Sequence, residues 1–122
     1  MLITADMIVL RGSVRTIACA KCLDGSMPAD EFLANLPESD RRKMAHLFLR
    51  MTTYGQICNS EKFKRERDRI WAFKTGGIRV ACFQNGVVWF LTHGFIKKKG
   101  KWPTEQLDRA DRIRNEHISV FN

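Results

Sequence analysis

Apolar residues recur along this chain with two different periods, and each period predicts a different kind of element. Between positions 38 and 54, four apolar side chains follow one another at spacings of three and four residues: Met44, Leu47, Phe48 and Met51. This spacing is typical of a helix that buries one stripe of its surface. Gly55 comes next and can adopt the left-handed conformation that ends many helices, so the pattern predicts a helix over residues 38–54.

Two shorter elements are predicted before this helix. The β-branched residues of Val14–Lys21 indicate a first strand, which the turn sequence Asp24-Gly25-Ser26 bounds. Pro28 suits the first turn of a helix, and a short apolar stripe after it ends at Pro37. We therefore expect one strand and one brief helix ahead of the long helix.

Three apolar segments follow the long helix in quick succession: Arg69–Lys74, Ile78–Phe83 and Val87–Phe95. Gly76-Gly77 separates the first two and Asn85-Gly86 the last two, and Asn-Gly is a strong signal for a tight hairpin. These segments predict an antiparallel meander. Pro103 then opens a final helix.

The order of strand, two helices, three strands and helix predicts an α+β fold with a small antiparallel sheet. We expect the helices to cover one face of the sheet and to leave the opposite face free for function. No repeat or linker divides the sequence, so residues 13–122 are expected to form a single domain after a possible N-terminal extension, residues 1–12. The start of the chain lacks the pattern of a signal peptide, and no apolar run is long enough to span a bilayer, which predicts a cytoplasmic protein with no membrane partner.

Charge is distributed unevenly along the chain. The net charge of +8 divides into +1 for residues 1–60, with seven basic and six acidic residues, and +7 for residues 61–122, with fourteen and seven. A concentrated positive field attracts polyanions, chiefly nucleic acid or an acidic protein partner. A basic surface that only keeps the protein soluble is the simpler alternative.

The four cysteines include one C-x-x-C pair, Cys19 and Cys22, a spacing that zinc sites and redox pairs use. Cys58 and Cys82 are not spaced as a second pair, which favours reduced structural thiols. No convincing cluster of metal ligands is present in the sequence, so we expect neither a metal nor another cofactor.

Two residues of the meander are candidates for chemistry. Arg79 interrupts the apolar segment IRVACF, where an unpaired guanidinium would be costly to bury and a phosphate or carboxylate would be a natural partner. His93 ends the last segment and could exchange a proton near neutral pH, although a lone histidine beside a strand end is more often structural.

The register of the hairpin decides whether Arg79 and His93 lie on the same face of the sheet. A two-residue loop, Asn85-Gly86, would place them on opposite faces. A three-residue loop ending at Gly86 would pair Arg79 with Leu91 and place Arg79 and His93 on one face. We predict the second arrangement.

The segment IRVACFQNGVVWFLTHGFIKKKGKWPTEQLDRA joins these candidates to His93-Gly94-Phe95, a pair of lysines, Pro103, Glu105 and Ala110. In this order it resembles the end of phage-derived HigB-like toxins of the RelE/ParE superfamily. The segment GSMPADEFLANLP and the Lys62-Phe63 pair are similar too, so the resemblance runs from about Val14 to Ile118. One departure is clear: where the family commonly has Glu-Leu-Arg, this chain has Ala72-Phe73-Lys74 and lacks that carboxylate.

The resemblance implies the toxin of a type II toxin–antitoxin system. Such a toxin is an endoribonuclease, or mRNA interferase, that cleaves mRNA, usually on the ribosome, and is inhibited by a cognate helix-turn-helix antitoxin. Metal-free RNA cleavage needs a base for the 2′-hydroxyl, cations for the charge on the phosphorane and an acid for the departing 5′-oxygen. We assign Arg79 and Lys74 to the transition-state charge and His93 to proton transfer. The remaining basic residues are assigned to the RNA backbone: Lys62, Lys64, Arg65, Arg67, Lys97, Lys98 and Lys99.

Two other functions are compatible with the same residues. The chain could be a ParE-like gyrase inhibitor of the same fold, or a prophage remnant that binds an antitoxin or nucleic acid without cleaving it. The carboxylate missing at Ala72 keeps the first of these alternatives open.

Overall fold

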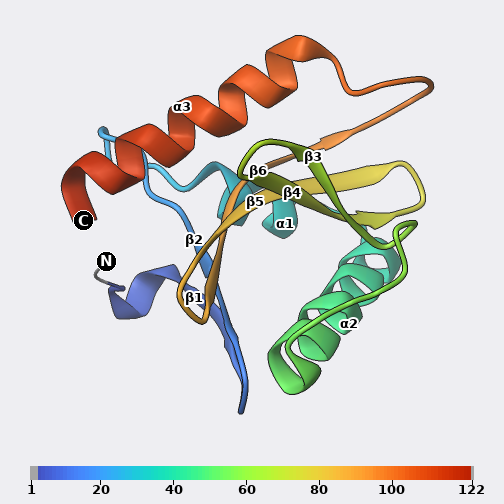
Figure 1. The fold of residues 1–122 in the computed structure, drawn as a ribbon, viewed down its shortest axis with the longest axis horizontal. Helices are drawn as coiled ribbons and strands as arrows, with labels where there is room; N and C mark the ends of the chain where they lie inside the picture. The colour runs from blue at the N-terminus through green and yellow to red at the C-terminus, as the bar shows by residue number, and fades with distance from the viewer. Residues whose placement is uncertain (1–2, 122) are drawn as a thin grey trace.

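The computed structural model of this protein describes residues 3–121 and has a six-stranded sheet at its centre (Figure 1). The strands are β1 (Ile8–Arg11), β2 (Thr16–Cys19), β3 (Phe63–Arg67), β4 (Ile70–Thr75), β5 (Ile78–Asn85) and β6 (Val88–Ile96). The helices are α1 (Pro28–Ala34), α2 (Glu38–Tyr54) and α3 (Thr104–Phe121), and a short 3-10 turn, Ala5–Met7, precedes β1. These elements confirm the predicted α+β class.

The sheet is mixed, whereas the sequence predicts an antiparallel one. Its spatial order is β1-β2-β6-β5-β4-β3, and β2 pairs with β6 in parallel. The other neighbours are antiparallel, including the predicted meander of β4, β5 and β6. A parallel pair requires a long crossover, and α1, α2 and strands β3–β5 lie in the chain between β2 and β6.

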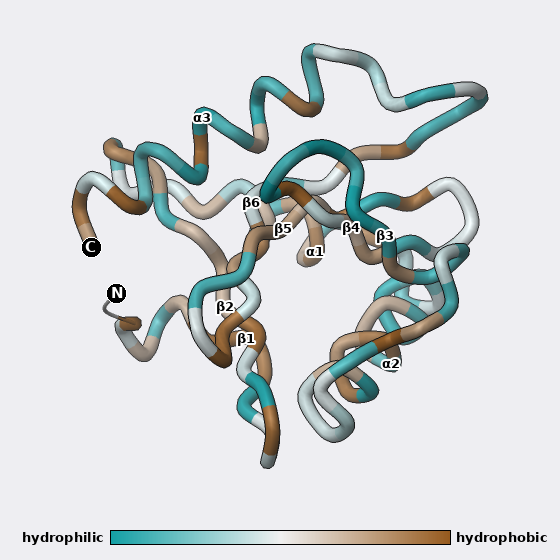
Figure 2. The backbone as a smooth tube through the Cα atoms, viewed as in Figure 1, coloured by the Kyte–Doolittle hydropathy of each residue, from teal (hydrophilic) through white to brown (hydrophobic). Residues whose placement is uncertain are grey.

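Two strands are present that the apolar pattern does not predict. β1 lies within the segment considered a possible extension, yet it pairs with β2, and Met7 just before it is buried. β3 is formed by the charged sequence FKRER at the other edge of the sheet, and only Phe63 of its residues is buried. Figure 2 shows this edge as a hydrophilic stretch of the tube. Charged side chains are common on edge strands, where they discourage pairing with other chains.

Helices cover both faces of the sheet, so the prediction that one face is left free is wrong. α1 and α2 pack on one face around a core that contains Phe48, Phe73 and Leu91. α3 packs across the other face over a second core that contains Phe83 and Phe90 (Figure 1). None of the helices within residues 3–121 is long and apolar enough to cross a membrane.

The long helix α2 has the bounds that its apolar stripe predicts. Met44, Leu47 and Met51 are buried along it. Gly55 has a φ of 82° and donates its N–H to the Met51 carbonyl at 2.8 Å, which ends the helix.

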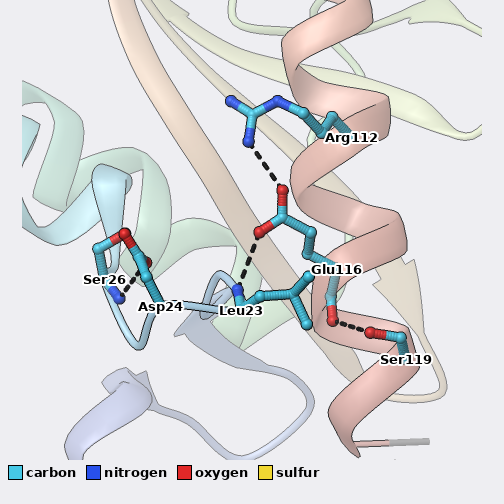
Figure 3. Close-up of polar contacts among 6 residues, drawn as sticks. All are labelled: Leu23, Asp24, Ser26, Arg112, Glu116 and Ser119. Carbon is cyan, nitrogen blue, oxygen red and sulfur yellow. Dashed lines mark hydrogen bonds and ion pairs between the residues drawn. The ribbon is translucent and has the colours of Figure 1, made fainter.

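Polar contacts fix α3 to the segment that follows β2. The Glu116 carboxylate accepts the Leu23 N–H at 2.8 Å and also accepts Arg112 Nη1 at 2.8 Å (Figure 3). His117 Nδ1 accepts the Lys21 N–H at 2.9 Å, within a cluster of aromatic rings. These bonds hold the C-terminal half of α3 over the second core.

The β5–β6 hairpin has neither of the registers considered from the sequence. Its loop is Gly86-Val87, since Asn85 pairs with Val88, and Arg79 pairs with Phe95 instead of Leu91. The pairing shifts between Cys82–Leu91 and Ala81–His93, which leaves Thr92 as an extra residue on β6. The Thr92 hydroxyl donates to the Ala81 carbonyl at 3.2 Å inside this β-bulge.

Because of this bulge, Arg79 and His93 share one face of the sheet as predicted, although the register differs from the predicted one. His93 pairs with Ala81, and Ala81 and Arg79 are two residues apart in β5. Side chains two residues apart in a strand share a face, so Arg79 and His93 lie on one face, the face that α3 packs against.

Candidate nucleic-acid cleft

A cleft of about 560 Å³ opens on the α3 side of the sheet, beyond the first turn of that helix. Its walls come from β3, β4, β5, the loop 97–103 and the start of α3. Five cationic side chains and one carboxylate line it: Lys64, Lys74, Arg79, Lys97, Lys101 and Glu66. Trp102 and Leu107 add apolar surface. A hollow with this excess of positive charge concentrates an anionic ligand.

The sheet register brings the two central cations together. Lys74 of β4 and Arg79 of β5 are directly opposite each other. The next pair on the same face is Ala72 and Ala81, both buried in the core under α3. Small residues therefore lie under the helix, and long cationic side chains begin where the helix no longer covers the sheet.

Arg79 has part of its guanidinium unused. Its Nη1 donates to the Gly76 carbonyl at 2.6 Å and to the Ile78 carbonyl at 3.0 Å, which fixes the direction of the side chain. Its Nε is buried and has no hydrogen-bond partner among residues 3–121. Burial lowers the pKa of Arg79, and the charge of Glu66 opposes that effect. An arginine nevertheless stays cationic in a protein, so this one offers a free donor to an anion.

Lys74 is held at the side of the cleft by the loop before β3. Its Nζ donates to the Ser60 carbonyl at 3.2 Å. Burial lowers the pKa of Lys74, Glu66 opposes this, and the charges of Arg79, Lys64 and Lys97 lower the pKa further. Lys74 is therefore a cation that releases a proton more readily than an ordinary lysine.

Glu66 lies on the cleft face together with Lys64, two residues before it in β3, and the bulge after Arg65 brings Arg67 to that face as well. Arg65 pairs with Trp71 and Arg67 with Ile70, so Glu66 is the extra residue between two consecutive pairs. Its Oε2 is buried without a hydrogen-bond partner among the described residues. The bulge allows Glu66 and its neighbour Arg67 to lie on the same side of the sheet, where Arg67 bonds to Asp108 and Asp111 of α3.

His93 is not part of the cleft lining. Its side chain is fully buried, with Nε2 2.8 Å from Gln106 Oε1 and Nδ1 3.3 Å from Thr92 Oγ1. Burial lowers the pKa of His93 to about 4, and the Gln106 bond only partly opposes this. Its ring stacks on Phe95, which in turn packs edge-on against Trp102 of the cleft wall. His93 thus supports the wall from inside the core.

The other basic residues considered from the sequence are spread over different surfaces. Lys64 and Lys97 line the cleft. Lys62 lies instead in a hollow of about 350 Å³ beside α2, with Arg42, His46 and Arg50. Arg67 is engaged with α3. The remaining three are exposed outside the cleft lining: Arg65, Lys98 and Lys99.

Six residues of the cleft are not among the sequence candidates: Glu66, Gly100, Lys101, Trp102, Thr104 and Leu107. Glu66 lies in a run of mixed charges, and the simplest interpretation of such a run is a set of ion pairs among its own residues. The sequence therefore gives no reason to select Glu66. FKRER contains one apolar residue, so no apolar alternation marks it as a strand. Trp102 lies after the last strand in the sequence, and the path of the loop 97–103 returns it to the cleft.

The cysteines are free and occupy separate places. Cys19 packs in the core under α1 and α2, whereas Cys22 packs in the core under α3. Burial raises the pKa of Cys19 to about 12 and raises that of Cys82 as well, so both are inert thiols. Residues 3–121 contain no group of three or more His, Cys, Asp or Glu side chains arranged to hold a metal ion.

The fold and the cleft together define a small basic α+β protein with a cation-rich site at one end of its sheet. Comparison with known families agrees with this description: the family model described as phage-derived protein Gp49-like (DUF891) matches residues 31–115, and the chain belongs to this family. The family is associated with RelE-like toxins of toxin–antitoxin systems. The matched range contains α2, β3–β6 and the whole cleft, but not β1 or β2. No curated protein matches the chain.

Proposed function

We propose that this protein is the toxin of a type II toxin–antitoxin system, of the HigB-like kind, and that it cleaves mRNA in the cleft described above. The observation that carries the proposal is the Lys74–Arg79 pair: two cations opposite each other on adjacent strands, with a free guanidinium donor, in a cleft that holds three further lysines. The family relationship to RelE-type endoribonucleases supports the same reaction.

The proposed reaction is an attack of the RNA 2′-oxygen on the adjacent phosphorus. The new P–O2′ bond forms as the P–O5′ bond breaks, which leaves a 2′,3′-cyclic phosphate and a 5′-hydroxyl. Arg79 and Lys74 stabilise the extra negative charge of the phosphorane, because both are fixed before the substrate arrives. Lys64, Lys97 and Lys101 hold the flanking phosphates. All of these roles are filled by side chains of the cleft.

His93 has a different part in this proposal from the one that its sequence position suggests. A general acid or base has to reach the proton that it transfers, directly or through one water. His93 is buried and already contacts Gln106, so we assign it to positioning the cleft wall.

The test compares Arg79→Ala and Arg79→Lys with the wild type on a single-stranded RNA and on mRNA during translation in vitro. Because Arg79 is proposed to stabilise only the transition state, Arg79→Ala should slow cleavage about 100-fold or more, and Arg79→Lys should recover part of the rate. Products should carry 2′,3′-cyclic phosphate ends. Arg11→Ala is the matched control, since Arg11 is exposed on β1, outside the cleft lining.

Other outcomes would identify other functions. Wild-type protein that leaves RNA intact with and without ribosomes would overturn the nuclease proposal. Inhibition of gyrase by this protein would then indicate a ParE-like toxin. Binding of RNA or of a co-expressed antitoxin without any other activity would indicate a prophage remnant. The antitoxin itself is proposed to be a helix-turn-helix protein, and co-purification with the product of the adjacent gene would test that partner.

A further inference from the structure

Glu66 is a carboxylate inside a cleft that otherwise attracts phosphate. A negative charge in this place weakens the binding of a polyanion, so a structural or chemical reason for it is needed. The usual structural reason would be an ion pair. Glu66 takes part in none of the ion pairs found among residues 3–121, although five cations share its cleft.

Glu66 has one carboxylate oxygen without a partner among residues 3–121. Its Oε2 is buried and accepts no hydrogen bond within the described chain, and Arg79 Nε across the same cleft is also unpartnered. A buried acceptor and a buried donor that do not satisfy each other are suited to a ligand that offers both a hydroxyl and an anion. A ribose 2′-hydroxyl beside a phosphodiester has these two groups on neighbouring atoms.

An irregularity of β3 places an anchor to α3 directly beside Glu66. Without the bulge in β3, consecutive side chains would alternate between the two faces. Lys64 and Glu66 share the cleft face by this alternation, and the extra residue brings Arg67 to the same face, so that Arg67 anchors β3 to α3 beside Glu66. Bulges recur beside active sites, where they redirect a side chain.

We propose that Glu66 is the general base of the RNA cleavage, an inference that rests on the function proposed above. The Glu66 carboxylate takes the proton of the 2′-hydroxyl as O2′ bonds to phosphorus. The P–O5′ bond breaks with its electron pair moving to O5′, which takes a proton from the Lys74 ammonium. Exchange with water then returns a proton to Lys74 and removes one from Glu66. Glu66 thus replaces, from the neighbouring strand, the carboxylate that is absent at Ala72.

The first experiment separates binding from chemistry with Glu66→Gln. Single-turnover cleavage of RNA should slow about 100-fold, which is typical for the loss of a general base. Binding of a 2′-O-methyl RNA of the same sequence, which cannot be cleaved, should stay equal or become tighter because a negative charge leaves the cleft. Glu105→Gln is the matched control: it removes the same charge from an exposed position at the start of α3, outside the lining. Thermal unfolding of both variants checks that they are folded.

The second experiment distinguishes Glu66 from Lys74 as the base. A carboxylate base gives a cleavage rate that falls on the acid side as it is protonated, and this limb should disappear in Glu66→Gln. A neutral Lys74 acting as the base would instead give a wild-type cleavage rate that rises towards alkaline pH. Lys74→Arg would then abolish this rise. That result would overturn the inference.

Failure of this inference can be told from failure of the proposed function. Wild-type protein that does not cleave RNA overturns both. Wild-type protein that cleaves while Glu66→Gln cleaves at the same rate, with the same pH dependence, overturns only the role of Glu66.

Discussion

Both ring nitrogens of His93 have a neighbour inside the protein, Thr92 on one side and Gln106 on the other. His117 is similarly enclosed, because its Nδ1 accepts the Lys21 N–H and its ring packs among Phe90 and Phe121. Burial is the main reason that the pKa of each histidine is lowered to about 4. In both cases a residue suited to proton transfer serves to join α3 to the sheet.

This burial makes stability depend on pH. Below the ordinary pKa of 6.5, the unfolded chain takes up protons on His93 and His117 that the folded protein does not bind, so the free energy of unfolding should fall as the pH decreases from about 6.5 towards 4. Urea unfolding between about pH 7 and pH 5 measures this slope while avoiding the range in which carboxylates titrate.

The matched variant is His93→Gln with His117→Asn, which keeps a hydrogen-bonding group near each position but removes the titration. Its stability at neutral pH should be lower than that of the wild type, and its curve over this interval should be flatter. A slope as steep as that of the wild type would show that other groups cause the loss.

Gly94 connects β6 to α1 at the scale of elements. A Cβ atom at this position would overlap the ring of Phe32 on α1, so the glycine allows the helix to lie directly on the strand. Of the segment His93-Gly94-Phe95 that suggested a toxin family, all three residues have a packing role: one is buried, one admits a helix, and one stacks behind the cleft wall.

Gly94→Ala should therefore destabilise the protein by about 1–3 kcal/mol, the usual cost of forcing extra volume into a packed contact. Chemical denaturation of the four proteins of a double-mutant cycle with Phe32→Ala tests the cause. In the Phe32→Ala background the same glycine substitution should cost much less, because the overlapping ring is gone. Equal costs in both backgrounds would mean that α1 does not depend on this contact.

Local patterns were sufficient for some elements and insufficient for others. The bounds of α2 follow from a stripe of four apolar residues and a terminal glycine, and both signals are contained in the helix itself. β3 is different, because an edge strand buries few of its side chains and its charged sequence carries no apolar period. The bulge at Thr92 is also invisible in the sequence, since it results from how β5 and β6 pair.

The site was predictable to the extent that strands could be placed. Arg79 and Lys74 stand in recognisable strands, and the structure brings them together. His93 was placed on the correct face, but nothing local to it indicates that Gln106 of α3 would cover it. Glu66 could not be selected without knowing that its strand lies beside Lys74.

At the scale of the whole molecule, the positive charge of residues 61–122 is spread over several surfaces, of which the cleft and the hollow beside α2 are two. Lys64, Lys97 and Lys101 lie in the cleft, whereas Lys62 lies beside α2. Electrostatic binding to single-stranded nucleic acid releases counterions, and each phosphate contact adds about 0.7 to the slope of log affinity against log salt.

Binding of 2′-O-methyl RNA should thus weaken as salt increases, and Lys97→Ala should reduce the slope by about 0.7, the value of one contact. Lys62→Ala removes the same charge from the other surface and should leave the slope unchanged. Fluorescence anisotropy over a series of salt concentrations measures both. If the two variants lowered the slope equally, the RNA would have to extend across β3 to the α2 side.

The extra residue at Thr92 also determines how β6 can vary. Before Thr92, the even-numbered residues Val88 and Phe90 face the core under α3. After Thr92, the odd-numbered residues His93 and Phe95 face that side. Replacing Thr92 with valine would cost one hydrogen bond and leave that order intact. Deleting Thr92 would let His93 follow Leu91 directly and still pair with Ala81, so His93 and Phe95 would keep their face. A regular ladder that retained Thr92 would instead turn His93 and Phe95 towards α1 and α2 and withdraw the support of Trp102. The bulge therefore accommodates one additional residue in β6, and by doing so it keeps the inner and outer surfaces of the cleft wall from changing places.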